Sequence, residues 1–241
     1  MEIITNPREI EAKSFGIVDK YLTSMKLPRF QKEVIKRVLH ATSDLNYAED
    51  LIFHPKAVRK ALSAIRNGKN IVVDASMVKA GINKKMLSTF GGKVICLINK
   101  EDLARQASRL NITRSILAMR KACKSMDGGI VAIGNAPTAL FEVCDLISKG
   151  KARPSLVIGV PVGFVGAKEA KKKLRALKIP YITNQSRRGG SSVAAACVNA
   201  LLKIAKEGDK EKNMLKLVTI ILVVINFMTL SFIDCVFGSD K

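Results

Sequence analysis

The sequence predicts a single α/β domain in which a helical N-terminal segment precedes a five-stranded parallel sheet. From residue 70 onward, five short apolar runs alternate with stretches that are long enough to cross over as helices. The runs are continuously apolar, as expected for parallel strands that are buried on both faces. Nothing in the 241 residues repeats at a fixed period, so one domain is the simplest organisation.

Helices are predicted ahead of the sheet. Residues 9–23 and residues 29–43 carry apolar side chains at spacings of three and four, and Pro28 separates the two stretches. Residues 55–67 begin with a proline and end before Gly68, which is the usual asymmetry of helix ends.

The strands and their connections follow in order along the chain. The five strands are predicted at residues 70–76, 93–99, 129–135, 155–163 and 180–184. The crossover helices are predicted at residues 83–90, 100–125, 136–149 and 167–178. A last helix over residues 193–206 completes a domain that we place at residues 1–206.

The composition is that of a globular protein, with 48% hydrophobic residues, but the formal net charge of +21 is unusual. Such a charge attracts nucleic acid, an anionic membrane surface, or a ligand with many carboxylates or phosphates. The few aromatic residues do not interleave with the basic runs, so a base-stacking surface for nucleic acid is not expected. Lysines in helical stretches, such as residues 168–178, are expected on solvated faces.

The cysteines show neither the spacing of a zinc site nor that of a disulfide framework. They are Cys96, Cys123, Cys144, Cys197 and Cys235. The first 15 residues contain early acids and no apolar run, so we expect no signal peptide and a reducing, cytoplasmic location.

The C-terminal end departs from this composition. A charged linker over residues 207–216 precedes a hydrophobic tail over residues 217–237, and residues 217–233 contain no charge. That length is at the lower limit for spanning a bilayer. A membrane anchor, an interfacial or oligomer-facing helix, and read-through from an adjoining coding frame are all compatible with it.

Small and polar residues follow three predicted strands, at Asp74, at residues 134–138 and at residues 159–163. Ligands of open α/β sheets bind beyond the carboxyl ends of the strands, so these turns are the expected site. Residues 187–192 add two arginines and two glycines before a helix, where cations and backbone amides can meet an anion.

Histidine is the side chain that commonly serves as acid and base near neutral pH, and the chain has two, His40 and His54. Arg37 precedes His40 by three residues, so both lie on one helical face, suited to holding a carboxylate and protonating a ring. The alternative is that His40 caps the carbonyls of a helix end. His54 is expected in a turn before Pro55. No nucleotide-binding loop, nucleophile elbow or zinc-protease motif occurs, so these residues alone indicate a binder of anionic organic ligands.

Seven short motifs occur in order along the chain. They are Ser14-Phe15 and residues 37–44 (RVLHATSD), 73–82 (VDASMVKAGI), 113–115 (TRS), 134–140 (GNAPTAL), 159–167 (GVPVGFVGA) and 188–191 (RGGS). Each motif is weak alone, but the ordered set is specific. With it, the chain resembles the precorrin-8X and cobalt-precorrin-8 methylmutase family of cobalamin biosynthesis.

The resemblance implies a three-layer α/β/α fold with a five-stranded parallel sheet, and a homodimer with active sites near the subunit interface. It implies an isomerase that moves a methyl group from ring carbon 11 to ring carbon 12 of precorrin-8 or cobalt-precorrin-8, giving hydrogenobyrinate or cobyrinate. No cofactor and no protein-bound metal are expected, and cobalt enters only with the substrate. The carboxylate arms of this substrate would be the partner of the basic charge.

The family's catalytic histidine falls on His40, and its substrate-binding serine and arginine fall on Ser14 and Arg37. Arg114 matches a further active-site arginine. The other motif positions expected to bind substrate are Thr42, Asp44, Asp74, Asn135, Thr138, Gly163, Arg188, Gly189, Gly190 and Ser191.

Two other functions are compatible with the composition. One is a non-enzymatic, membrane-tethered carrier of anionic tetrapyrroles, and the other is a basic nucleic-acid binder, which the scarcity of aromatic residues makes the weakest. The tail departs from the family pattern, which ends near residue 206, so membrane contact through the tail stays open.

Overall fold

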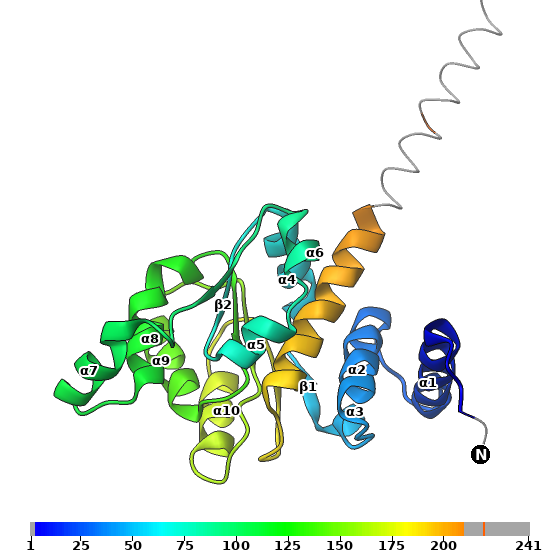
Figure 1. The fold of residues 1–241 in the computed structure, drawn as a ribbon, viewed down its shortest axis with the longest axis horizontal. Helices are drawn as coiled ribbons and strands as arrows, with labels where there is room; N and C mark the ends of the chain where they lie inside the picture. The colour runs from blue at the N-terminus through cyan, green and yellow to red at the C-terminus, as the bar shows by residue number, and fades with distance from the viewer. Residues whose placement is uncertain (1–2, 210–218, 220–241) are drawn as a thin grey trace, which may run out of the picture. The chain divides into compact units, whose positions relative to one another are not determined.

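A computed structural model describes residues 3–209 and residue 219 of the chain (Figure 1). One compact unit ends at Leu202 and a second begins at Lys203, and the fold below is that of the first unit. The domain end expected at residue 206 falls within a helix, because residues 191–209 are helical. Apart from residues 207–209 and 219, the predicted linker and hydrophobic tail lie outside the described residues. No helix in the described part of the chain is both long and apolar enough to cross a membrane.

A six-stranded sheet with the strand order β1-β6-β5-β4-β2-β3 forms the centre of the unit. All five predicted strands are present, and each pairs in parallel with its neighbours among them. They are β2 (Ile71–Val73), β3 (Val94–Cys96), β4 (Ile130–Ile133), β5 (Leu156–Gly159) and β6 (Tyr181–Asn184).

The predicted count of five strands was one too low, because β1 (Leu51–Phe53) pairs antiparallel with β6 at the sheet edge. The register places Leu51 opposite Asn184 and Phe53 opposite Ile182. A strand of three residues between helices offers too few positions to show an apolar pattern, so the sequence carried no signal for it.

The order of the parallel strands places the expected site at one edge of the sheet. Counted along the chain, the five parallel strands have the order 2-1-3-4-5, with a switch point between β2 and β4. Connections diverge at a switch point and open a crevice beyond the carboxyl ends of the strands. The turns that begin at Asp74, Gly134 and Val160 follow β2, β4 and β5, and therefore lie along this edge.

Four helices cover one face of the sheet (Figure 1). They are α7 (Glu101–Arg109), α8 (Arg114–Ala122), α9 (Pro137–Ser148) and α10 (Ala167–Arg175). Their buried side chains form one cluster with Val72, Val131 and Val157 of the sheet. Removing this apolar surface from water stabilises the layer by about 25 cal/mol per Å².

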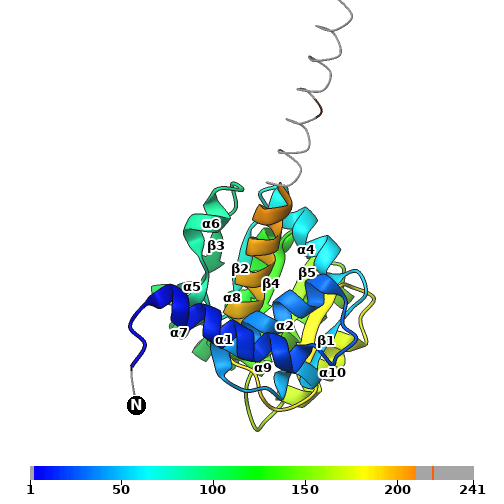
Figure 2. The same cartoon turned by 90° about the vertical axis from the view of Figure 1, so that its right-hand side faces the viewer.

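The opposite face is covered by α4 (Ala57–Arg66), α2 (Arg29–Thr42) and the helix over residues 191–202, and α1 (Pro7–Leu22) packs on α2 (Figure 2). The short helices α5 (Ser76–Gly81) and α6 (Lys84–Ser88) connect β2 to β3, and α3 (Tyr47–Asp50) precedes β1. The unit is therefore a three-layer α/β/α structure.

The stretch over residues 100–125, predicted as one helix, is divided into α7, α8 and a 3-10 turn, η1 (Cys123–Met126). Asn111 adopts a left-handed conformation with φ 48°, which ends the first helix. The hydroxyl of Thr113 then accepts a hydrogen bond from the Ile116 amide and caps the second.

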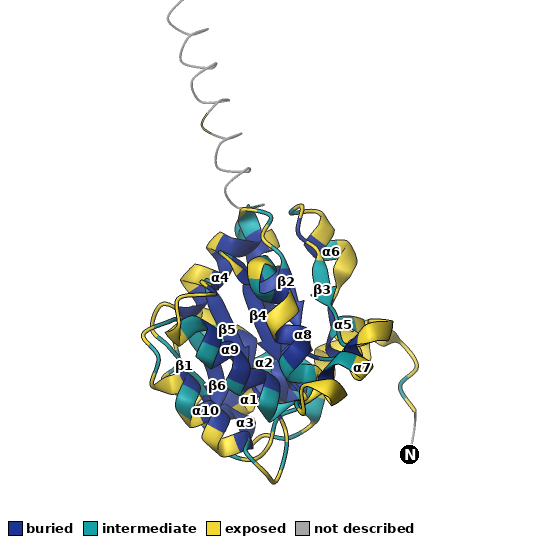
Figure 3. Cartoon of the chain, turned by 90° about the vertical axis from the view of Figure 1, so that its left-hand side faces the viewer, coloured by how far each residue is buried: buried dark blue, intermediate teal, exposed yellow. Residues whose placement is uncertain are grey.

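Strands β2, β4 and β5 are buried along their whole length, as their continuously apolar runs predicted (Figure 3). Strand β3, at the edge opposite β1, is only partly buried. The buried central strands therefore support the turns at their carboxyl ends.

Candidate active site

His40 lies in the last turn of α2 and contacts α1 in two ways. Its Nδ1 is 2.9 Å from Ser14 Oγ. The Phe15 ring stacks on the imidazole, with 4.7 Å between the ring centroids and 27° between the planes, and Lys36 Nζ lies 4.8 Å from the Phe15 ring centroid. Nε2 of His40 has no hydrogen-bond partner among the described residues. The half-buried imidazole is thus held at one nitrogen and one face, and the other nitrogen is left for a ligand.

Arg37 and His40 share one helical face, as their spacing predicted. Arg37 Nη1 lies 3.8 Å from Glu11 Oε1, and Glu11 precedes Ser14 by three residues on α1. The Arg37 side chain is 40% exposed and that of Glu11 58%, so the ion pair is weak. The guanidinium therefore stays available to a second anion.

The end of α2 turns sharply into Asp44. Ser43 adopts a left-handed conformation with φ 53°, which closes the helix. The hydroxyl of Thr42 donates to the Val38 carbonyl at 2.8 Å and accepts from the Asp44 amide at 3.3 Å. Hydrogen bonds from the side-chain and backbone amides of Asn46 lower the pKa of the Asp44 carboxyl. The turn therefore presents a stable negative charge.

Arg188, in the loop of residues 185–190, forms an ion pair with the Asp44 carboxylate. Its Nη1 is 3.1 Å from Asp44 Oδ2. The hydroxyl of Tyr47 donates to the Gly189 carbonyl at 3.4 Å. These two contacts bring the loop against the end of α2.

Asp50 holds the same loop from another side. Its carboxylate accepts hydrogen bonds from the backbone amides of Gln185 and Ser186, both at 2.9 Å, and from the side chains of Ser186 and Asn184. Burial alone would raise the pKa of Asp50, but the hydrogen bonds from Ser186 and Asn184 outweigh it and lower the pKa. The charged carboxylate thus fixes the start of the loop.

Lys171 supplies the matching buried cation and is 1% exposed. Its Nζ donates to the carbonyls of Ser186, at 2.8 Å, and of Arg188. Burial lowers the pKa of the amine to about 8. The solvated face predicted over residues 168–178 is correct for Lys168 but wrong for Lys171, because the loop carbonyls draw this amine inside.

Asp74 closes the switch point between β2 and β4. Its Oδ1 accepts from the Gly134 amide at 3.0 Å, and its Oδ2 accepts from the amides of Asn135 and Ala136 at 2.9 and 2.7 Å. Burial raises the pKa of this carboxyl, and the three amides oppose the rise. Asp74 is 1% exposed and both of its oxygens accept hydrogen bonds from this turn, and its direct contact with substrate stays a prediction. It shapes the turn that exposes Asn135.

The turns after β4, β5 and β6 pack on one another. The Gly190 amide donates to the Val160 carbonyl at 2.9 Å, and the Gly163 amide donates to the Arg187 carbonyl at 3.2 Å. A Cβ atom at Gly134 would lie 2.8 Å from the Gly190 carbonyl oxygen, so only glycine allows this approach. The packing gathers the predicted residues Gly163, Gly190 and Ser191.

Arg114 and Thr138 lie at the N-termini of α8 and α9. The hydroxyls of Thr113 and Thr138 are 3.1 Å apart, which joins the two helix ends. Arg114 is exposed and forms no ion pair with a described residue. Within the described part of the chain, no hydrogen bond or ion pair links these residues to His40.

Sequence reasoning missed Phe15, Asp50 and Lys171 as parts of the site. The one available signal was that Phe15 stands beside Ser14 in a motif. Asp50 and the loop amides it binds lie 135 and 136 positions apart, a distance at which a local pattern carries no information. His54 lies in a turn as predicted, with Nδ1 accepting from the amide two residues on.

Comparisons with known proteins agree on one family. A family model described as precorrin-8X methylmutase matches residues 9–204. The cobalt-precorrin-8 methylmutase of Priestia megaterium is 44% identical over 206 residues, which cover 86% of this chain and 92% of that relative. The precorrin-8X methylmutase of Pseudomonas aeruginosa is 36% identical, with 83% of this chain and 97% of the relative covered. The solved structure of precorrin-8X methyl mutase from Thermus thermophilus matches with a TM-score of 0.78 at 38% identity, covering 83% of this chain and 97% of that one.

Proposed function

The chain belongs to the precorrin-8X methylmutase family and is a methyl-shifting isomerase of cobalamin biosynthesis, and we propose that His40 moves the proton in its reaction. The substrate is a corrinoid precursor. One observation carries the proposal: the imidazole is held at Nδ1 by Ser14 and on its face by Phe15, while Nε2 has no partner among the described residues.

The proposed reaction is an internal rearrangement of the macrocycle. A methyl group leaves ring carbon 11 and bonds to ring carbon 12, and the electrons of the conjugated system redistribute between the two. Substrate and product are isomers, so a proton that His40 places on the ring before the shift returns to His40 after it. We infer that the reaction needs no redox cofactor and no resident metal, because the conversion of one isomer into another involves no net oxidation. Any cobalt then belongs to the substrate.

Ser14 would set the tautomer of His40. As the acid, His40 is an imidazolium, in which Nδ1–H donates to the serine hydroxyl and Nε2–H faces the substrate. After Nε2 has given its proton to the ring, the neutral imidazole keeps the proton on Nδ1, and Nε2 is the acceptor that takes the proton back. Stacking on Phe15 limits rotation of the imidazole ring. A positioned acid–base group typically contributes about 10² to 10⁴ in rate.

Arginines are proposed to hold the carboxylate arms of the substrate. Arg37 and Arg114 are the available cations, because Arg37 is weakly paired and Arg114 has no ion-pair partner among the described residues. Arg188 is already paired with Asp44 and is proposed to orient the neighbouring glycine turn toward the substrate. Other residues proposed to line the site are Thr42, Asn135, Thr138, Gly163, Gly189, Gly190 and Ser191, and Asp74 is proposed to act through the turn it holds.

A homodimer is part of the proposal. The turn after β5 exposes Val162, Phe164 and Val165, with Phe164 89% and Val165 88% exposed. Neighbouring apolar side chains at a site edge are typical of an interface. Sedimentation equilibrium is expected to give twice the chain mass of 26.3 kDa, and Phe164→Asp is expected to shift the protein toward the monomer. A wild-type chain that sediments as a monomer would contradict the dimer.

A cytoplasmic location is also proposed. The cysteines among the described residues, Cys96, Cys123, Cys144 and Cys197, are all free, which suits a reducing compartment. Burial raises the pKa of Cys144 and Cys197 to about 12, so these two thiols are poor nucleophiles.

Substituting His40 with Asn tests the assignment of the proton. Turnover is followed by absorbance, because the methyl shift alters the conjugation of the macrocycle. His40→Asn is expected to lower kcat by roughly 100-fold or more. KM should change by no more than about threefold, because the substituted group acts in the transition state. Ser14→Ala should lower kcat less, by about tenfold, because the imidazole remains.

His54→Asn is the matched control, since this histidine lies in a turn and contacts Tyr181. Its kcat should equal that of the wild type. Normal turnover by His40→Asn would refute the role of His40. A wild-type chain that binds the corrinoid precursor but leaves its absorbance unchanged would favour the tetrapyrrole carrier.

A further inference from the structure

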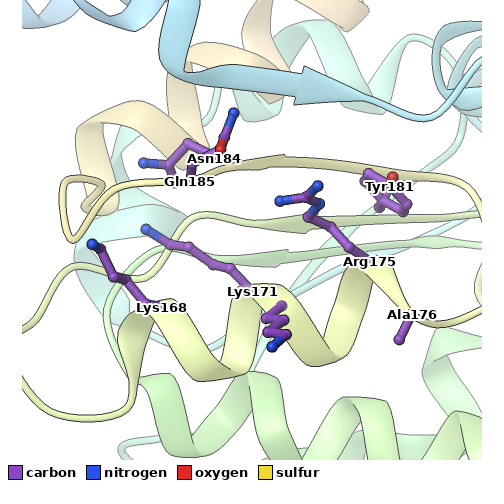
Figure 4. A pocket seen from close by; sticks show the side chains of 8 residues that line it. Lys168, Lys171, Arg175, Ala176, Tyr181, Asn184 and Gln185 are labelled. Carbon is purple, nitrogen blue, oxygen red and sulfur yellow. The ribbon is translucent and has the colours of Figure 1, made fainter.

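A basic pocket of about 460 Å³ lies between α10 and β6 (Figure 4). It is lined by Lys168, Lys171, Lys172, Arg175, Ala176, Tyr181, Asn184 and Gln185. None of these residues belongs to the set proposed to bind the corrinoid. A cavity of this size is typical of small-molecule sites.

Exposed cations of α10 line the pocket without acidic partners. Lys168, Lys172 and Arg175 are spaced by four and three residues, so they lie along one face of the helix. None of them forms a salt bridge with a described residue, whereas Lys173 of the same helix pairs with Asp145. No Asp or Glu side chain is among the lining residues. The three exposed cations therefore present unpaired positive charge to the pocket, while the Asp50 carboxylate lies behind its wall, 2.8 Å from Asn184 Nδ2.

Buried polar side chains complete the pocket wall. Lys171 Nζ donates to two carbonyls, and an ammonium has three N–H donors, so one donor remains. Asn184 is fully buried, and its Nδ2 is shared among three acceptors. Its Oδ1 has no hydrogen-bond partner. Buried polar atoms without partners are rare in folded proteins, so an orphan acceptor and a spare donor that line the same pocket indicate a missing ligand.

We propose that this pocket binds a phosphate-type anion, either free or as part of a small phosphate ester. The cations would hold the ionised oxygens. Hydrogenphosphate also carries a hydroxyl, which can donate to Asn184 Oδ1, and the hydroxyls of a phosphorylated polyol can do the same. Sulfate has a similar shape and charge but no hydroxyl at neutral pH. The volume beyond one phosphate accommodates an organic group.

Titration calorimetry of the full-length chain, in a buffer free of phosphate and sulfate, tests the site. Inorganic phosphate is expected to bind about tenfold more tightly than sulfate, because only phosphate satisfies the orphan acceptor. The double variant Lys168→Gln/Arg175→Gln should weaken phosphate binding by about tenfold or more. The control variant Lys149→Gln/Lys178→Gln removes the same charge from exposed positions outside the pocket lining and should bind phosphate as the wild type does.

Equal weakening in both double variants would overturn the proposal, because binding would then follow only the net charge of the chain. Equal affinity for phosphate and sulfate would overturn it as well, since the orphan acceptor would play no part. Tighter binding of glycerol 3-phosphate than of inorganic phosphate would support an ester as the ligand, and weaker binding would support free phosphate. Corrinoid turnover by Lys168→Gln/Arg175→Gln should equal that of the wild type, so this site and the active site are tested separately.

Discussion

Gly189→Ala is expected to destabilise the turn that carries Arg188, and the neighbouring Gly190→Ala isolates the cause. Both glycines have positive φ, 150° at Gly189 and 127° at Gly190. A Cβ atom at Gly189 would lie 2.2 Å from the Val160 carbonyl oxygen and 2.9 Å from the Pro161 carbonyl oxygen, whereas one at Gly190 meets nothing within 4 Å. The two substitutions thus share backbone strain but differ in collision.

The expected losses of unfolding free energy follow from the backbone strain and from the collision. An alanine held at an unfavourable positive φ costs about 1–3 kcal/mol, which is the whole effect expected for Gly190→Ala. At Gly189 the colliding atoms are backbone, so no rotamer relieves the overlap and the turn must move. Its movement strains the 2.9 Å hydrogen bond from the Gly190 amide to the Val160 carbonyl. Overpacking adds about 1–3 kcal/mol, giving roughly 2–6 kcal/mol in total for Gly189→Ala.

Urea unfolding followed by far-UV circular dichroism measures both variants, because the chain has no tryptophan to report by fluorescence. Gly189→Ala should lower the free energy of unfolding further than Gly190→Ala does, and it should also lower kcat/KM because the Arg188 turn shifts. Equal losses of stability in the two variants would refute the collision as the cause.

Two further predictions concern buried charges. Asp74→Asn puts an amide donor against the amides of residues 134–136 and should lower the free energy of unfolding by roughly 2–4 kcal/mol in urea titrations. A smaller loss would show that the turn does not depend on the Asp74 carboxylate. Lys171 has a folded-state pKa of about 8 against 10.5 for the free side chain, so the unfolded chain binds more protons between these values. Raising the pH from 7 to 10 should therefore stabilise the wild type relative to Lys171→Met by up to about 3 kcal/mol. A difference in unfolding free energy between the two proteins that does not change with pH would contradict the burial of the Lys171 amine.

Local patterns in the sequence were sufficient for the elements that form the layers. Continuous apolar runs identify parallel strands because a strand that is buried on both faces carries apolar side chains on both. The spacing of Arg37 and His40 places them on one face because the helical period acts within one turn. The same local rules failed over residues 100–125, where the left-handed Asn111 interrupts a stretch that reads as one helix. They also missed β1, which exists only through its pairing with β6.

Only the tertiary structure decided which side chains work together. Ser14 and His40 are 26 positions apart and meet because α1 packs on α2. Asp74 follows a strand in the way that ligand-binding residues do, yet its carboxylate accepts hydrogen bonds from three backbone amides of the turn after β4. Lys171 lies in a run of lysines that the sequence predicts to be solvated. It is buried because its amine donates hydrogen bonds to the carbonyls of residues 186 and 188. Periodicity determines which face of an element is apolar, but the partner of a polar group depends on packing between segments distant in the chain.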